Sequence, residues 1–215
     1  MTENSFQAEY NVTKKTKIRK FYEENKTLIY SFIIFIFIAF GSFSYYLDVK
    51  ERKKIELSES YLLAKIYLEK EEKEKAKVLL EKVVFANDKT YSTLSFFLIM
   101  NQKLITDNNE LLNLFDHLLL NNKYEDELRN LLIYKKALFS ADFIKEDELL
   151  KSIKPVLNSD TIWKSHGLLL LGDYFMARGE HNKAIEFYQK IFTINNLHQN
   201  LYDHARSQLA IISNE

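Results

Sequence analysis

The chain has 215 residues, with 30 basic and 30 acidic side chains, no cysteine, one proline and four glycines. The absence of cysteine excludes disulfides and thiolate chemistry, and the balanced charge lacks the clustered positive charge that nucleic-acid binding requires. Since so few prolines and glycines leave little material for tight turns between strands, the composition predicts an all-α protein.

An uncharged stretch near the N-terminus dominates the hydropathy of the chain. It covers residues 27–47, TLIYSFIIFIFIAFGSFSYYL, between Lys26 and Asp48. At about 1.5 Å per residue, a helix of this length crosses the roughly 30 Å hydrocarbon core of a bilayer. A cleaved signal peptide is disfavoured because 26 residues precede the stretch, and a buried soluble helix is disfavoured because it has no polar face. We therefore predict a transmembrane helix at 27–47.

The segments on either side of the span are polar. Residues 1–26 form a short polar and basic head, and its first 12 residues show no hydrophobic period, so we expect them to be unstructured. Residues 48–57 form a charged stalk. Six basic residues precede the span and five follow it within about 20 residues, which leaves the topology open with a slight preference for a cytoplasmic N-terminus.

Residues 58–215 show the periodicity of successive amphipathic helices. Two helices are predicted on either side of the charged run 69–75, with Asp107 or Asn108 as an N-cap further on and Pro155 ending the sixth helix. The later pairs are predicted at 91–104 with 109–120, 125–140 with 145–154, and 160–177 with 182–193. A last helix is predicted at 199–212.

An internal repeat relates the first and fourth pairs. Five positions recur with offsets of +1, +4, +13 and +17 from the first member, and they hold large, small, aromatic, alanine and large side chains in that order. In the first pair they are Leu63, Ala64, Tyr67, Ala76 and Leu80, and in the fourth pair Leu171, Gly172, Phe175, Ala184 and Tyr188. Small residues at two of these positions allow two helices to approach closely.

These positions resemble the tetratricopeptide repeat, a helical hairpin with small residues at the helix contact and a glycine in the turn. Gly179 matches the turn glycine, Glu71 replaces it in the first hairpin, and the two middle hairpins do not keep the motif. The resemblance implies an α-solenoid of about four degenerate hairpins with a C-terminal capping helix. It also implies a peptide-binding surface on the first helix of each hairpin, here Tyr61, Lys65, Leu68, His166, Leu169, Asp173 and Met176.

The order of the parts is similar to the YfgM-type family of ancillary subunits of the bacterial Sec translocon. The local matches are residues 21–26 (FYEENK), Tyr45-Tyr46, residues 90–94 (TYSTL) and Trp163 ahead of the segment 172–179. The resemblance implies a single-pass inner-membrane protein with its N-terminus in the cytoplasm and its repeat domain in the periplasm. Translocon subunits, periplasmic chaperones and emerging polypeptides are the partners that it implies.

The sequence shows no catalytic constellation. It has no glycine-rich phosphate loop, none of the five histidines forms an H-E-x-x-H motif or an i, i+4 pair, and no serine lies in a G-x-S-x-G elbow. We expect no cofactor, no metal and no enzymatic activity, and core packing for Trp163. The alternatives are a scaffold of another membrane assembly with a cytoplasmic repeat domain, and an enzyme whose catalytic groups the sequence does not reveal.

Overall fold

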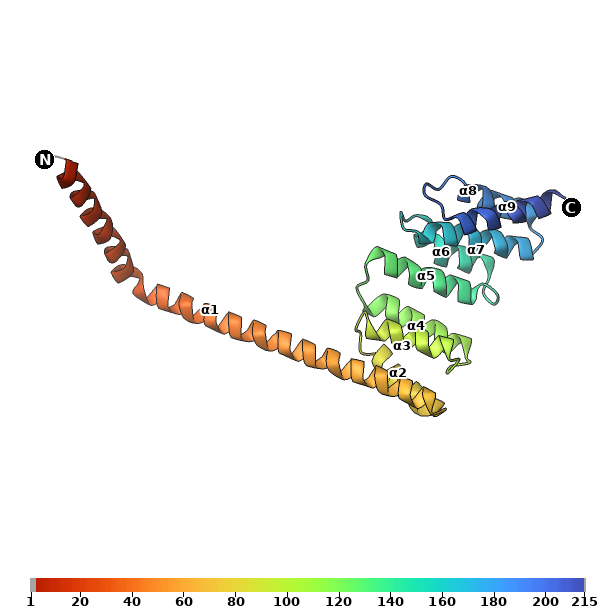
Figure 1. The fold of residues 1–215 in the computed structure, drawn as a ribbon, viewed down its shortest axis with the longest axis horizontal. Helices are drawn as coiled ribbons and strands as arrows, with labels where there is room; N and C mark the ends of the chain where they lie inside the picture. The colour runs from red at the N-terminus through yellow and green to blue at the C-terminus, as the bar shows by residue number, and fades with distance from the viewer. Residues whose placement is uncertain (1–2, 215) are drawn as a thin grey trace. The chain divides into compact units, whose positions relative to one another are not determined.

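The computed structural model describes the backbone of residues 3–214 and the side chains of residues 19–214. All regular structure in the described part is helical, which confirms the predicted all-α class (Figure 1). The helices are α1 (Glu3–Glu69), α2 (Lys73–Val84), α3 (Tyr91–Asn101), α4 (Asn108–Asn121), α5 (Asp126–Ser140), α6 (Glu146–Leu157), α7 (Trp163–Ala177), α8 (His181–Ile191) and α9 (Gln199–Ser213).

The chain divides into two compact units, Met1–Glu56 and Leu57–Glu215. In the first unit, α1 contains a segment that is long and apolar enough to cross a membrane, and none of that segment is buried within the structure. Phe35 and Phe37, for example, expose 67% and 74% of their surface. Such exposure of large apolar side chains is stable in lipid and costly in water.

The expectation of an unstructured head at residues 1–12 is wrong from Glu3 onward, where α1 begins. Residues 1 and 2 lie outside the described part. The physical reason is the cooperativity of helices: once a long apolar helix is formed, each further residue adds a hydrogen bond without a new nucleation cost.

The second unit consists of helical hairpins in chain order, followed by one extra helix, as predicted. α2 packs against α3, α5 against α6, α7 against α8, and α9 packs on both α7 and α8. Asp107 is the N-cap of α4, where its Oδ1 accepts hydrogen bonds from the backbone N–H groups of Asn109 (2.7 Å) and Glu110 (3.4 Å). A long apolar helix followed by a helical-repeat region is thus the architecture of the chain.

The hydrophobic core of the second unit has two parts. One part joins the end of α1 to α2, α3 and α4 and includes Ala64, Ala76, Leu80, Phe96 and Phe115. The other part joins α5 to α9 and includes Ala137, Ile153, Leu171, Tyr188 and Ala205. Phe139 of α5 packs against the first part and Leu119 of α4 against the second, so the two parts meet between α4 and α5.

The prediction that Pro155 ends the sixth helix is wrong, because α6 continues to Leu157. A proline at this position loses one hydrogen bond to the carbonyl of Lys151, which is exposed and therefore open to water. The next turn buries Val156 completely, and the backbone N–H of Asn158 still donates to the carbonyl of Lys154 at 3.1 Å. Burial of Val156 offsets the lost bond.

Candidate protein-binding surface

The fourth hairpin is built around a very close contact between α7 and α8. A Cβ placed on Gly172 would lie 2.4 Å from Cε1 of Tyr188, so only glycine fits there. Tyr188 and Ala184 are fully buried. In the first hairpin the equivalent residues are Ala64 and Leu80, also fully buried. The larger residue on one helix is therefore matched by the smaller one on the other.

The turns of these two hairpins have the same backbone conformation. Gly179 has φ +71° and Glu71 has φ +62°, both in the left-handed region. In the first turn, the N–H of Glu72 donates to the carbonyl of Tyr67 at 2.9 Å, and the equivalent bond from Glu180 to Phe175 measures 3.0 Å. Glu71 thus occupies the place of the turn glycine at a conformational cost.

A lysine near the start of the second helix is held in the same way in both hairpins. Lys75 pairs with Glu72 and lies 5.4 Å from the ring centroid of Tyr67. Lys183 pairs with Glu180 at 2.7 Å and lies 4.8 Å from the ring centroid of Phe175. A second carboxylate from α6, that of Glu146, also binds Lys183 at 2.7 Å, and hydrogen bonds to Glu146 and Glu180 raise the pKa of this lysine.

The turn between α3 and α4 keeps this geometry although its sequence does not keep the motif. Lys103 has φ +51°, and the N–H of Leu104 donates to the carbonyl of Ile99 at 3.0 Å. This is the same six-residue closure that ends the first helix of the first and fourth hairpins. Sequence reasoning missed it because Lys103, like Glu71, gives no glycine signal.

Leu63 differs from its counterpart in the fourth hairpin. Leu171 is fully buried, whereas Leu63 exposes 41% of its surface and lines a shallow pocket of about 400 Å³ with Tyr67 and Val78. The packing role predicted for Leu63 is therefore met only in part. The difference follows from position in the array, since α5 and α6 cover α7 but no earlier hairpin in the second unit covers the end of α1.

The predicted peptide-binding residues of the first hairpin lie at the edge of its core. Tyr61 and Leu68 are half-buried and pack against the first part of the core, while Lys65 is exposed. The ring of Tyr61 lies 6.3 Å from that of Tyr91 on α3. This aromatic pair links the first helices of two consecutive hairpins.

An aromatic cluster links α5 and α7 in the same manner. Tyr134 stacks on Trp163 with ring centroids 5.7 Å apart, and His166 contacts both rings at 5.7 and 5.1 Å. All three side chains are half-buried. Trp163 packs against the core, as predicted, and keeps part of its surface open. Sequence reasoning missed Tyr134, which it had placed in a hairpin without the motif.

Leu169 and Met176 are also half-buried and pack against the second part of the core. Together with His166 and Asp173, they occupy four positions of α7, so the structure brings the fourth-hairpin residues onto one helix. Those of the first hairpin lie on α1.

Asp173 is engaged inside the domain. Its Oδ1 accepts a hydrogen bond from the hydroxyl of Tyr188 on α8 (2.7 Å) and contacts Nε2 of His204 on α9 at 3.0 Å. Burial, and then the bond to Asp173, raise the pKa of Tyr188. Burial and the negative charge of Asp173 also raise the pKa of Tyr134. This carboxylate therefore joins three helices, a role that no short sequence motif announces.

Comparison with known proteins supports the repeat assignment. A family model described as tetratricopeptide repeat matches residues 60–87 and 165–196. The domain carries tetratricopeptide-like repeats. The matched segments are the first and fourth hairpins, whose turns, lysine contacts and small-to-large pairs agree in detail. No curated protein and no solved structure matches the chain. Tetratricopeptide repeats indicate a protein–protein interaction scaffold.

Proposed function

We propose that the protein is a membrane-anchored interaction module that serves as an ancillary subunit of the Sec translocon. The observation that carries this proposal is a tetratricopeptide-like domain in a chain whose N-terminal helix is long and apolar enough to span a bilayer. The resemblance to the YfgM-type family in the order of parts and in the segments around residues 21–26 and 90–94 supports the choice of the translocon.

In this proposal residues 1–26 are a cytoplasmic head, 27–47 the span, 48–57 a stalk and 58–215 the interaction domain on the periplasmic side of a bacterial inner membrane. Tethering acts through effective concentration, because a domain held at the exit site meets each emerging chain at a far higher local concentration than a free domain would. A weak binding surface then suffices, and periplasmic chaperones are the next partners of the bound polypeptide.

The first helices of the hairpins supply the proposed contact surface. The aromatic pair Tyr61–Tyr91 and the cluster of Tyr134, Trp163 and His166 offer half-buried rings, which bind apolar side chains of an extended segment at little cost in side-chain entropy. Lys65, Leu68, Leu169 and Met176 complete the surface. Asp173 contributes by holding α9, because its carboxylate is already bound to Tyr188 and His204.

Co-purification tests the translocon assignment. The tagged full-length protein, and a variant whose residues 27–47 are replaced by an unrelated span, are isolated in mild detergent and their partners identified by mass spectrometry. Translocon subunits and periplasmic chaperones enriched with the native protein are the expected result. Their absence from both samples would remove the translocon and leave a scaffold of another membrane assembly.

A topology measurement tests the side of the membrane. The chain has no native cysteine, so Asn214→Cys introduces a single thiol at the end of the domain. An impermeant thiol reagent should label it in intact cells. Labelling only after the cells are opened would place the domain in the cytoplasm and contradict the proposed location. A cysteine in the head, such as Ser5→Cys, is the matched control and should behave in the opposite way.

A further inference from the structure

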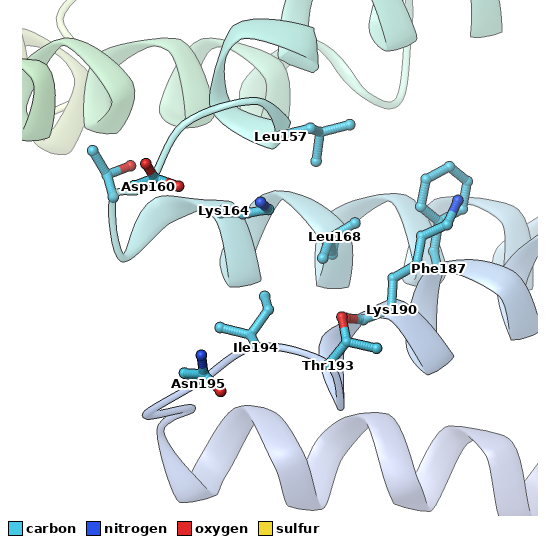
Figure 2. A pocket seen from close by; sticks show the side chains of 10 residues that line it. Leu157, Asp160, Lys164, Leu168, Phe187, Lys190, Thr193, Ile194 and Asn195 are labelled. Atoms are coloured by element: carbon cyan, nitrogen blue, oxygen red, sulfur yellow. The ribbon is translucent and has the colours of Figure 1, made fainter.

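A pocket of about 520 Å³ lies at the end of the fourth hairpin, away from the contacts described above (Figure 2). Its wall is formed by the connection between α6 and α7, the first turns of α7, the end of α8 and the connection to α9. The lining residues are Leu157, Asp160, Thr161, Lys164, Leu168, Phe187, Lys190, Thr193, Ile194 and Asn195. This volume lies within the range of small-molecule sites.

The apolar part of the lining is continuous with the core. Leu168 is buried, and Leu157, Phe187 and Ile194 are half-buried and pack against the second part of the core. An apolar group that entered the pocket would therefore be removed from water on a preformed surface, which is favourable in proportion to the area covered.

Two lysines line the same pocket from different helices. Lys164 comes from the first turn of α7 and Lys190 from the last turn of α8, where its Nζ lies 4.9 Å from the ring centroid of Phe187. In the first hairpin, 108 residues earlier, the equivalent positions hold Glu56 and Lys82. The fourth hairpin has thus exchanged an acidic residue for a second basic one. Two cations beside one pocket repel each other unless an anion lies between them.

The remaining polar groups limit the charge of that anion. Asp160 is the single carboxylate of the lining, so two lysines and one aspartate leave one net positive charge. The hydroxyl of Thr193 donates to the carbonyl of Lys190 at 2.7 Å and keeps its lone pairs free to accept. Asn195 adds an amide. This set matches a monoanion better than a phosphate monoester, which carries nearly two charges at neutral pH.

We propose that this pocket binds a small monocarboxylate with an apolar body. The apolar part lies against Leu168 and Phe187, and the carboxylate lies between the ammonium groups of Lys164 and Lys190. This assignment is independent of the translocon and of the side of the membrane, so either can fail without the other.

Binding is tested with 4-phenylbutyrate and its neutral analogue 4-phenylbutanamide. Full-length protein in lipid nanodiscs is titrated by calorimetry, and empty nanodiscs provide the reference heat. The acid should bind at least tenfold more tightly than the amide. In Lys164→Glu, which restores the acidic residue found at the equivalent position of the first hairpin, affinity for the acid should fall at least tenfold. Lys123→Glu makes the same charge change outside the lining and should bind as the native protein does.

Circular dichroism establishes that each variant is folded. If Lys164→Glu unfolds, Lys190→Gln removes the other charge at nearly constant size and should also weaken the acid selectively. Equal affinity for acid and amide, equal affinity of native protein and folded variants, or no binding of the acid at millimolar concentration would each overturn the proposal.

Discussion

The ring of Tyr188 fills the space that a side chain on residue 172 would need. A Cβ on Gly172 would lie within 2.4 to 2.9 Å of three ring atoms of Tyr188. The ring cannot move aside easily, because Tyr188 is fully buried and its hydroxyl is held by Asp173. Two helices are therefore fixed at a distance that one glycine and one tyrosine determine together.

Gly172→Ala should destabilise the domain. Alanine gains about 1 kcal/mol of helix propensity over glycine, but overpacking against a fixed ring costs typically 1–3 kcal/mol. We expect a net loss of up to about 2 kcal/mol in the free energy of unfolding. Urea unfolding, followed by the fluorescence of Trp163, the only tryptophan, measures it.

A double variant separates overpacking from other causes. Gly172→Ala with Tyr188→Leu recreates the pair Ala64 and Leu80 of the first hairpin, which packs without exposed surface. The double variant should be more stable than the sum of the two single losses predicts, as expected for residues in direct contact. Strict additivity would mean that the contact does not limit stability.

Glu71→Gly should stabilise the first hairpin. A left-handed φ of +62° costs a non-glycine residue about 1–2 kcal/mol, while glycine loses more backbone entropy on folding, so the net gain is about 0.5–1 kcal/mol. Glu69→Gly, inside α1, is the matched control and should destabilise. Thermal unfolding by circular dichroism distinguishes the two, and a loss of stability in Glu71→Gly would contradict the argument.

Local patterns predicted the hairpins, the N-cap at Asp107 and the repeat that relates the first and fourth hairpins. These features depend on residues close in sequence, whose period or spacing is visible directly. The turn at Lys103 escaped prediction because a left-handed residue other than glycine has no sequence signature. Pro155 was misplaced because burial of the following Val156 outweighs one lost hydrogen bond.

Long-range relations were beyond the sequence. The repeat predicted equal packing for Leu63 and Leu171, but burial depends on whether a neighbouring hairpin covers the helix. Asp173 was predicted as a surface residue of α7, whereas its partner His204 lies 31 residues later on a helix outside the repeat pattern. Only the packing of α9 on α7 and α8 brings the two together.

Asp173→Ala and His204→Ala should differ in effect. Loss of the carboxylate leaves the hydroxyl of buried Tyr188 without its acceptor, which costs about 1–3 kcal/mol. His204 and Asp173 expose 42% and 43% of their side chains, so loss of that pair costs about 0–1 kcal/mol. Urea unfolding should therefore report a larger loss for Asp173→Ala.

Hydrogen exchange gives a second readout for these variants. Both should increase amide exchange in α9, because both remove its link to α7. Asp203→Ala is the matched control, since Asp203 bonds only to Gln199 of the same helix among the interactions described here, and exchange across α7 and α8 should be unaffected. Unchanged protection of α9 in His204→Ala would show that apolar packing alone holds this helix.

Stability should fall at alkaline pH, and Tyr188 should account for part of the fall. An ordinary tyrosine has a pKa near 10, and burial and the bond to Asp173 raise the pKa of Tyr188 in the folded protein. Above about pH 10 the unfolded chain loses this proton while the folded protein keeps it, so the folded state binds more protons and the free energy of unfolding decreases as pH rises. Each such group contributes up to about 1.4 kcal/mol per pH unit. Urea unfolding between pH 8 and 11 should show this slope, and Tyr188→Phe should flatten it without abolishing it, because burial also raises the pKa values of Tyr124 and Tyr134. Equal slopes for the two proteins would mean that Tyr188 ionises without opposing the fold, which is incompatible with its buried bond to Asp173.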